Sequence, residues 1–145
     1  MKKALILLFF TTLSCSNEDL QEEYLLDRIE NVVWTRGSNF KVFKNNPFRL
    51  ILVEEGFCIE FSEAPKLIEG NEFQYTLLEN GKDTLRLEYR VTGQQVNHCG
   101  TFNYFIDAQG ELIRNYVECG AFYKESLRTN FYKAEQSLST LCPDL

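Results

Sequence analysis

Alternating apolar and polar residues are the feature of this sequence that most restricts its fold. Between residues 84 and 91, four apolar side chains alternate with four polar ones, which gives a strand one buried face and one solvated face. The apolar residues are Leu85, Leu87, Tyr89 and Val91. Phe73, Tyr75 and Leu77 alternate with polar neighbours in the same way. These patterns predict antiparallel strands that share one core.

Similar apolar runs, separated by turn residues, continue along most of the chain after residue 31. The further strands that they predict are Val32–Arg36, Phe40–Lys44, Phe48–Val53, Phe57–Ser62, Thr101–Asp107, Glu111–Cys119 and Leu127–Lys133. Eight or nine short strands with mostly tight connections favour an antiparallel up-and-down β-barrel, because closing the sheet removes its exposed edges. A β-sandwich of two sheets is the alternative.

Three connections carry a glycine as the third residue of a short loop. They are Glu54-Glu55-Gly56, Glu79-Asn80-Gly81 and Ala108-Gln109-Gly110. Each is predicted to be a three-residue hairpin loop whose glycine takes the left-handed conformation. In the second hairpin this loop pairs Tyr75 with Leu85, so that buried faces match. The two-residue turn that the Asn-Gly pair alone suggests would place a buried face against a wet one.

The first residues have the composition of an export signal. Lys2 and Lys3 precede the unbroken apolar run Ala4–Phe10, which is the order of charge and hydrophobicity in a secretory signal peptide. This run is much shorter than the roughly 20 residues that a membrane-spanning helix needs. We therefore expect residues 1–14 to be a signal peptide that is removed on export.

Cys15 stands where such a signal would be cut. Leu13-Ser14-Cys15 resembles a bacterial lipobox, in which the cysteine carries a diacylglycerol, with the leucine one place later than in that pattern. Ser16-Asn17-Glu18-Asp19 resembles the acidic export tag of Bacteroidota-type surface lipoproteins. The resemblance implies lipidation of Cys15, with acyl chains such as palmitate, and anchoring in the outer membrane. Either the cell surface or the periplasmic face is possible, and the acidic tag favours the surface.

The cysteine count agrees with lipidation. The chain has five cysteines, and a lipid on Cys15 leaves an even number in an exported protein, which suggests two disulfides. Counting outward from the third predicted loop places Cys99 opposite Cys119, in a register that does not depend on the cysteines. Cys58 and Cys142 then form the second pair. A zinc site usually has closely spaced ligand pairs, and these four cysteines are dispersed.

Charge and motif content argue against several classes of partner. The formal charge is -6 at pH 7, and an acidic surface repels phosphate backbones, so no nucleic-acid partner is expected. The sequence has no glycine-rich phosphate loop, and no cofactor is expected. His98 is the only histidine and neighbours Cys99 at a strand end, so we expect neither a metal site nor an enzyme.

The chain divides into three parts on these arguments. After the signal peptide, residues 15–30 are predicted to be a lipidated tether with a short helix within Glu18–Glu30. The apolar face of that helix would consist of Leu20, Tyr24, Leu25 and Ile29. Residues 31–145 are predicted to form a single β-barrel domain.

The first strand carries a resemblance to a known fold family. Asn31-Val32-Val33-Trp34 and the hairpins after it resemble small lipocalin-like domains, which commonly have a tryptophan on this strand. Val32 stands where that family usually has a glycine. The resemblance spans roughly residues 27–134 and implies an up-and-down barrel able to hold a ligand.

Aromatic residues dominate the predicted interior. The registers above point Phe73, Tyr75, Tyr89, Phe102, Tyr104 and Tyr116 to one side of the sheet. Arg114 falls on that side opposite Tyr104, and a buried charge needs a partner, which either Glu118 or a bound carboxylate would supply. The predicted ligand-binding residues are Trp34, Tyr75, Tyr89, Tyr104, Arg114 and Tyr116.

Two functions remain open at this point. The first is a lipid-anchored envelope protein that binds a small apolar or anionic ligand in its barrel. The second is a surface or structural lipoprotein with a filled core that binds another protein. A cavity lined by Arg114 and the tyrosines would favour the first, and an exposed apolar patch would favour the second.

Overall fold

The computed structural model describes residues 23–94, 96–120 and 127–145. Its strands are β1 (Val33–Arg36), β2 (Asn39–Lys44), β3 (Arg49–Glu54), β4 (Phe57–Ser62), β5 (Lys66–Ile68), β6 (Asn71–Asn80), β7 (Leu85–Thr92), β8 (Asn97–Ile106), β9 (Leu112–Glu118) and β10 (Leu127–Lys133). Its helices are α1 (Leu25–Ile29) and α2 (Leu138–Leu141). Cys15 lies outside the described residues, and its lipidation therefore stays a prediction.

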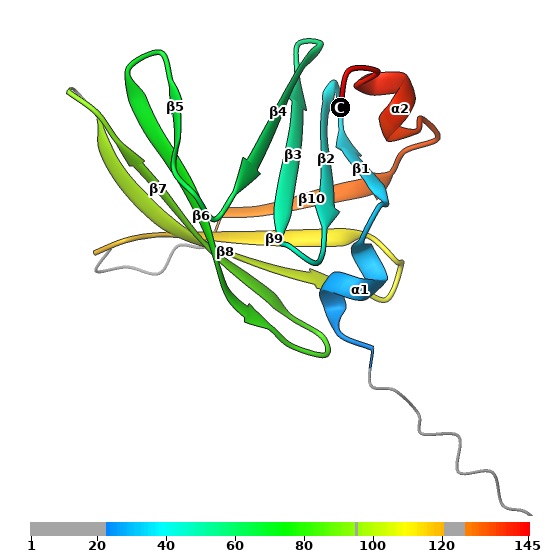
Figure 1. Ribbon diagram of the computed structural model, residues 1–145. Coiled ribbons are helices and arrows are strands. Elements are labelled where there is room, and N and C mark those ends of the chain that lie inside the picture. Colours follow the sequence, from blue (N-terminus) through cyan, green and yellow to red (C-terminus); the bar gives the residue numbers. More distant parts are fainter. Residues whose placement is uncertain (1–22, 95, 121–126) are drawn as a thin grey trace, which may run out of the picture.

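The described strands form one antiparallel sheet that curls into a nearly closed barrel (Figure 1). The strand order is β4-β3-β2-β1-β10-β9-β8-β7-β6-β5, so that β1 pairs with β10 and brings the start of the domain beside its end. The predicted barrel class is confirmed, with ten strands where eight or nine were expected. The additional short strand β5 has only three residues, and its alternation is too short to recognise.

Side chains close the seam between the two ends of this strand order. The Phe61 ring on β4 lies 4.9 Å from the Tyr75 ring on β6, measured between ring centroids. Lys66 Nζ donates to the Glu60 carbonyl oxygen at 2.8 Å. Gln74 Nε2 donates to the carbonyl oxygen of residue 63 at 3.1 Å. These contacts hold β4 against β5 and β6 and bring the two edges of the sheet together.

Helix α1 closes one end of the barrel, below β1 in Figure 1. Leu25, Leu26 and Ile29 are fully buried in the main core. The predicted helix is therefore present but begins at Leu25, and Tyr24, expected on its buried face, is exposed instead. Among the described residues, neither helix has the length and apolar content needed to cross a bilayer.

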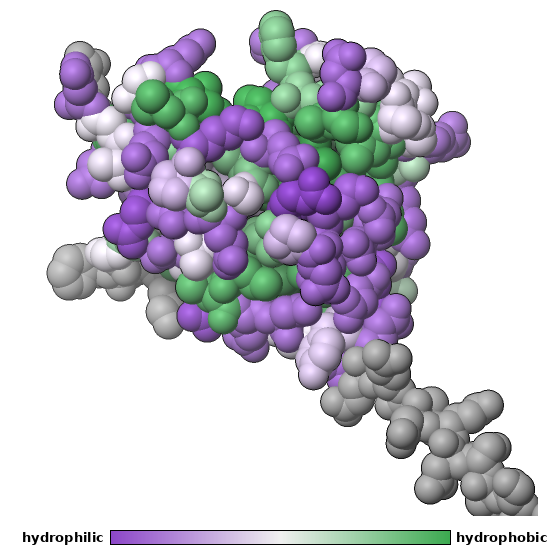
Figure 2. All heavy atoms as spheres, viewed as in Figure 1, coloured by the Kyte–Doolittle hydropathy of each residue, from purple (hydrophilic) through white to green (hydrophobic). Residues whose placement is uncertain are grey.

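The C-terminal segment covers the outer face of β1 to β4, where it builds a second core. Its buried members are Val33, Val42, Ile51, Val53 and Cys142. The Cys58–Cys142 disulfide, with Cα atoms 5.9 Å apart, fastens this segment to β4 and confirms the predicted pair. Figure 2 shows hydrophobic atoms near the upper edge of the viewed face and a further group near its lower edge, whereas most of the face is hydrophilic. Strands β1, β2 and β3 thus bury side chains on both faces, and the outer face of β4 is partly covered.

The third predicted hairpin is correct. Asp107 N donates to the Glu111 carbonyl oxygen at 3.0 Å across the mouth of the loop, and Gly110 has φ of 80°. The same register places Cys99 beside Cys119, whose disulfide has a Cα separation of 5.4 Å. The three-residue loop and the cross-strand disulfide are therefore both confirmed.

The first predicted hairpin is wrong by one residue. Glu54 pairs with Phe57, which leaves a two-residue loop of Glu55 and Gly56. Both loop residues have positive φ, 51° and 84°, as a type I′ turn requires. The second core explains why alternation did not reveal this register, because β3 buries side chains on both faces and both faces of β4 are partly covered.

The second predicted hairpin is also wrong. Tyr75 pairs with Tyr89 rather than Leu85, and the register shifts between Leu77 and Glu79. The turn differs from the expected one because its residues accept hydrogen bonds from the start of α1. Leu26 N donates to Asn80 Oδ1 at 3.1 Å, and the neighbouring N–H of residue 25 donates to the carbonyl oxygen of residue 81 at 2.9 Å. The buried face of β6 still pairs with the buried face of β7, because the bulge offsets the change in register caused by the different loop.

Candidate functional site

Stacked aromatic rings fill the middle of the barrel. Tyr75 contacts Phe61, Tyr89 and Phe102, with ring centroids 4.9 to 6.3 Å apart. Such offset and tilted arrangements are favourable for aromatic pairs. Burial raises the pKa of Tyr75, because its phenolate would be poorly solvated among these rings. The middle of the barrel is therefore a packed aromatic core.

A buried lysine lies next to this aromatic core, in contact with Tyr104. Lys41 on β2 is 6 % exposed, and its Nζ lies 4.0 Å from the centroid of the Phe131 ring. Nζ donates to the Tyr104 hydroxyl at 3.5 Å. Burial lowers the pKa of Lys41 well below its usual 10.5, Arg114 lowers it further, and Glu54 acts in the opposite direction.

Arg114 on β9 is the second cation of the interior. Its guanidinium carbon lies 5.0 Å from the centroid of the Phe102 ring and 5.5 Å from that of Phe131. Nη2 donates to Thr129 Oγ1 at 3.2 Å, while the buried Nε has no hydrogen-bond partner among the described residues. Tyr104 lies opposite Arg114 as predicted. Burial raises the pKa of Tyr104 to about 12, and the charge of Arg114 limits the rise.

Lys41 and Arg114 have no carboxylate within ion-pairing distance among the residues that the structure describes. Glu54 is the acid that acts on Lys41 electrostatically, and it does so without direct contact. Glu118 was one of the two partners expected for Arg114, the other being a bound carboxylate, and Glu118 does not take that role. Glu118 Oε1 instead lies 3.3 Å from His98 Nδ1. A cation held away from water without a carboxylate is energetically costly, and this part of the barrel holds the buried Lys41 and the half-buried Arg114.

Two adjoining compartments open onto these cations. The inner compartment, of about 110 Å³, is lined by Arg36, Asn39, Phe40, Lys41, Leu52, Glu54, Arg114, Thr129 and Phe131. The outer compartment, of about 360 Å³, is lined by Arg36, Phe102, Arg114, Tyr116, Leu127, Arg128 and Thr129. Both lie at the end of the barrel opposite α1, and we call them together the cationic mouth. Its described lining includes four basic side chains and one carboxylate, within a protein whose total charge is negative.

A polar cluster borders the outer compartment. His98 Nε2 is hydrogen-bonded to the Tyr116 hydroxyl, and Nδ1 faces Glu118 as described above. The Tyr116 ring lies over Gly100, where an added Cβ would be 2.1 Å from the ring atom Cε2. His98 is thus part of a side-chain network across β8 and β9, and it holds Tyr116 in position at the edge of the mouth.

The structure gathers some of the predicted ligand-binding residues and separates others. Arg114 and Tyr116 line the mouth, and Tyr104 contacts Lys41 from below. Tyr75 and Tyr89 belong to the packed aromatic layer. Trp34 is 1 % exposed in the main core and lines neither compartment.

Sequence reasoning missed Lys41, although the sequence contains an ambiguous signal. In the strand Phe40–Lys44, Phe40 and Val42 share one face while Lys41 and Phe43 share the other. Both faces carry apolar residues, so alternation alone does not select the inner one. The second core takes Phe40 and Val42, which turns Lys41 inward. Thr129, Arg36 and Arg128 were missed for a simpler reason, because polar residues near strand ends usually face solvent.

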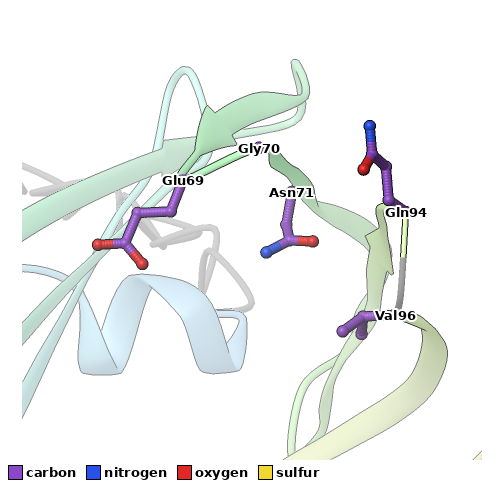
Figure 3. Close-up of a pocket in the computed structure, with 5 residues that line it drawn as sticks. All are labelled: Glu69, Gly70, Asn71, Gln94 and Val96. Carbon is purple, nitrogen blue, oxygen red and sulfur yellow. The ribbon is translucent and has the colours of Figure 1, made fainter.

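A further pocket lies between the β5–β6 and β7–β8 loops (Figure 3). It has about 350 Å³ and is lined by Glu69, Gly70, Asn71, Gln94 and Val96. Figure 3 shows Glu69 pointing away from Gln94 and Val96, which come from the other loop. Glu69, Gln94 and Val96 are exposed, and the described lining includes no buried charge. This pocket therefore lacks the chemistry that distinguishes the cationic mouth.

No protein-family model matches this chain, and no curated protein or solved structure is significantly similar to it. Within the described ranges, no group of three or more histidine, cysteine, aspartate or glutamate residues is arranged to hold a metal ion. The mouth itself is therefore the basis for assigning a function.

Proposed function

We propose that this chain is a lipid-anchored envelope protein that binds a small organic anion in its cationic mouth. The observation that carries the proposal is the pair of Lys41 and Arg114, which face the same inner compartment with no contacting carboxylate among the described residues. A bound carboxylate would supply the missing negative charge and an acceptor for Arg114 Nε.

The surroundings of these cations favour an anion that has an apolar part. Phe131 and Leu52 line the inner compartment, and Phe102 and Leu127 line the outer one. Ligand sites in proteins commonly combine mainly apolar walls with a few polar groups that fix the orientation. A simple inorganic ion would leave these walls in contact with water. A carboxylate on an alkyl or aromatic body uses both kinds of surface.

The test is calorimetric titration with octanoate, with octanol as the uncharged probe of the same length. The proposal predicts saturable binding of octanoate and a much weaker response to octanol. Lys41→Met and Arg114→Gln should each weaken octanoate binding at least tenfold. Arg86→Gln is the matched control, because Arg86 is a half-exposed strand residue that pairs with Glu79 away from the mouth. An equal loss of octanoate affinity in Arg86→Gln would show that the total charge of the protein, and not the two cations of the mouth, determines binding.

The lipid anchor is a separate part of the proposal, supported by the sequence of residues 1–19. Two or more acyl chains hold a protein stably in a bilayer, where one chain does not. Cys15→Ala should move the protein from the membrane fraction to the soluble fraction, and metabolic labelling with palmitate should be lost with it. Retention of the variant in membranes would count against the anchor and would leave the mouth unaffected.

The alternative function, a surface that binds another protein, has less support. The described residues do include exposed large hydrophobic side chains, among them Phe57, Leu67 and Leu127. They come from three different strands, β4, β5 and β10, and single exposed apolar residues are common on soluble proteins.

A further inference from the structure

The two compartments of the mouth share a wall and differ in one cation each. Arg36, Arg114 and Thr129 line both of them. Lys41 belongs to the inner compartment alone, and Arg128 to the outer compartment alone. A ligand that extends from one to the other would pass Arg114 and meet a separate basic group at each end.

A ligand with one anionic group, bound in the inner compartment, would leave positive charge in the described lining of the outer compartment without a counter-charge. Three arginines line it, and its described lining contains no acidic residue. Arg128 is exposed, and its Nε donates to Asn130 Oδ1 at 3.4 Å, an amide that carries no charge, and no described carboxylate pairs with the guanidinium. The inner compartment has Glu54 to offset part of its charge, and the described part of the outer one has no equivalent.

The space between these charges is apolar. Besides the three arginines and Thr129, the described lining of the outer compartment consists of Phe102, Tyr116 and Leu127. Phe102 is fixed by the ring stack beneath it, and Tyr116 is fixed by its hydrogen bond to His98 and its position over Gly100. These two rings form a rigid surface suited to the hydrocarbon part of a ligand.

We infer that the ligand is a small organic dianion whose two anionic groups are joined by an apolar body. One group binds Lys41 and Arg114 in the inner compartment. The other group binds Arg128 and Arg36 at the outer rim, and the body lies on Phe102. This inference rests on the proposed anion-binding function, since it specifies the class of anion that the same mouth selects.

The experiment compares dicarboxylates with monocarboxylates of equal length. The full chain, purified in neutral detergent, is titrated calorimetrically with hexanedioate, octanedioate and decanedioate, and with hexanoate, octanoate and decanoate. The length series allows for the span between the two basic groups. We expect at least one dicarboxylate to bind tenfold or more tightly than the monocarboxylate of the same length, with the advantage reduced by added salt.

Arg128→Gln separates this inference from the proposed function. The variant should weaken binding of the dicarboxylate much more than binding of the monocarboxylate of the same length, so that the advantage of the dicarboxylate is abolished. Arg128 is exposed, so its replacement is not expected to impair folding. Arg86→Gln, on the outside of β7, is again the control that should leave both affinities unchanged.

The outcomes are distinct. If monocarboxylates and dicarboxylates bind equally well at every length, the dianion is excluded and the proposed function stands. If the dicarboxylate advantage survives Arg128→Gln, the second anionic group is not bound at the outer rim, and the inference is wrong. If no carboxylate of either series binds, both the inference and the proposed function are contradicted.

Discussion

The amine of Lys41 donates a hydrogen bond to the hydroxyl of Tyr104 at 3.5 Å, and both groups are buried. A neutral hydroxyl compensates a buried ammonium only in part, because it supplies a dipole where a carboxylate would supply a full charge. The folded protein therefore carries an energetic cost at this position. Such costs are typical of sites where another molecule completes the interaction.

Replacing this lysine should stabilise the empty protein. Lys41→Met keeps the length of the side chain and removes the buried amine. Even whole buried ion pairs can be replaced by apolar residues of similar volume with a neutral effect or a gain of about 1–4 kcal/mol, and the amine of Lys41 has no described carboxylate partner to lose. We expect a higher midpoint in urea at pH 7, together with the loss of anion binding described above. A clear fall in stability would show that the amine is better compensated than the contacts of Lys41 indicate.

The same lysine should make the stability depend on pH. Its pKa is lowered in the folded state, so between that value and the unfolded value near 10.5 the unfolded chain binds one more proton. The free energy of unfolding should therefore rise with pH in this window, and the rise should be absent in Lys41→Met. Deprotonation of Tyr104, with a pKa of about 12, acts in the opposite direction only above about pH 10. Urea titrations from about pH 7 to about pH 9.5 measure the slope.

Gly100 should be needed for the position of Tyr116. A Cβ at residue 100 would lie 2.1 Å from Tyr116 Cε2, so Gly100→Ala must displace the ring and its hydrogen bond to His98. Overpacking of this kind typically costs about 1–3 kcal/mol. In a Tyr116→Ala background the ring is gone, and the same glycine substitution should cost much less. A double-mutant cycle measured by urea unfolding gives the coupling, and additive effects would disprove the contact.

The two disulfides should differ in their contribution to stability. Cys58–Cys142 closes 84 residues and Cys99–Cys119 closes 20. The chain-entropy relation gives about 4.6 kcal/mol for the longer loop and about 3.3 kcal/mol for the shorter one at 25 °C. Pairwise replacement by serine should therefore destabilise the Cys58–Cys142 variant more. It should also loosen the C-terminal segment, detectable as faster hydrogen exchange there. Equal exchange in both variants would mean that packing alone holds this segment.

The barrel was predictable because strand alternation and turn residues operate at short range. The third hairpin shows how far this goes, since its loop length alone places Cys99 and Cys119 opposite each other, where they form a disulfide. The other two hairpins failed where tertiary contacts intervene. Asn80 and Gly81 bind α1 as well as forming the turn, and the C-terminal segment covers the outer face of β3 and part of β4. Both effects come from segments distant in the sequence, so the residues of the hairpins themselves do not indicate them.

The candidate site was only partly predictable for the same reason. Arg114 and Tyr116 followed from the register of β8 and β9, which the sequence determines well. Lys41 depends on which face of β2 turns inward, and that choice is made by the C-terminal segment around Cys142, at the other end of the domain sequence. The aromatic residues were correctly assigned to the interior, but position along the barrel axis decides whether a ring fills the core or lines the mouth.

Nuclear magnetic resonance of the Lys41 side chain tests the proposed anion site most directly. With lysine labelled by ¹³C and ¹⁵N, the Cε and Nζ shifts are followed against pH, with and without octanoate, and Lys41→Met assigns the signal. We expect Lys41 to titrate well below its usual pKa of 10.5 in the free protein, and octanoate to raise that pKa. A lysine that titrates near 10.5 in both conditions would contradict the buried cation and its role as an anion receptor.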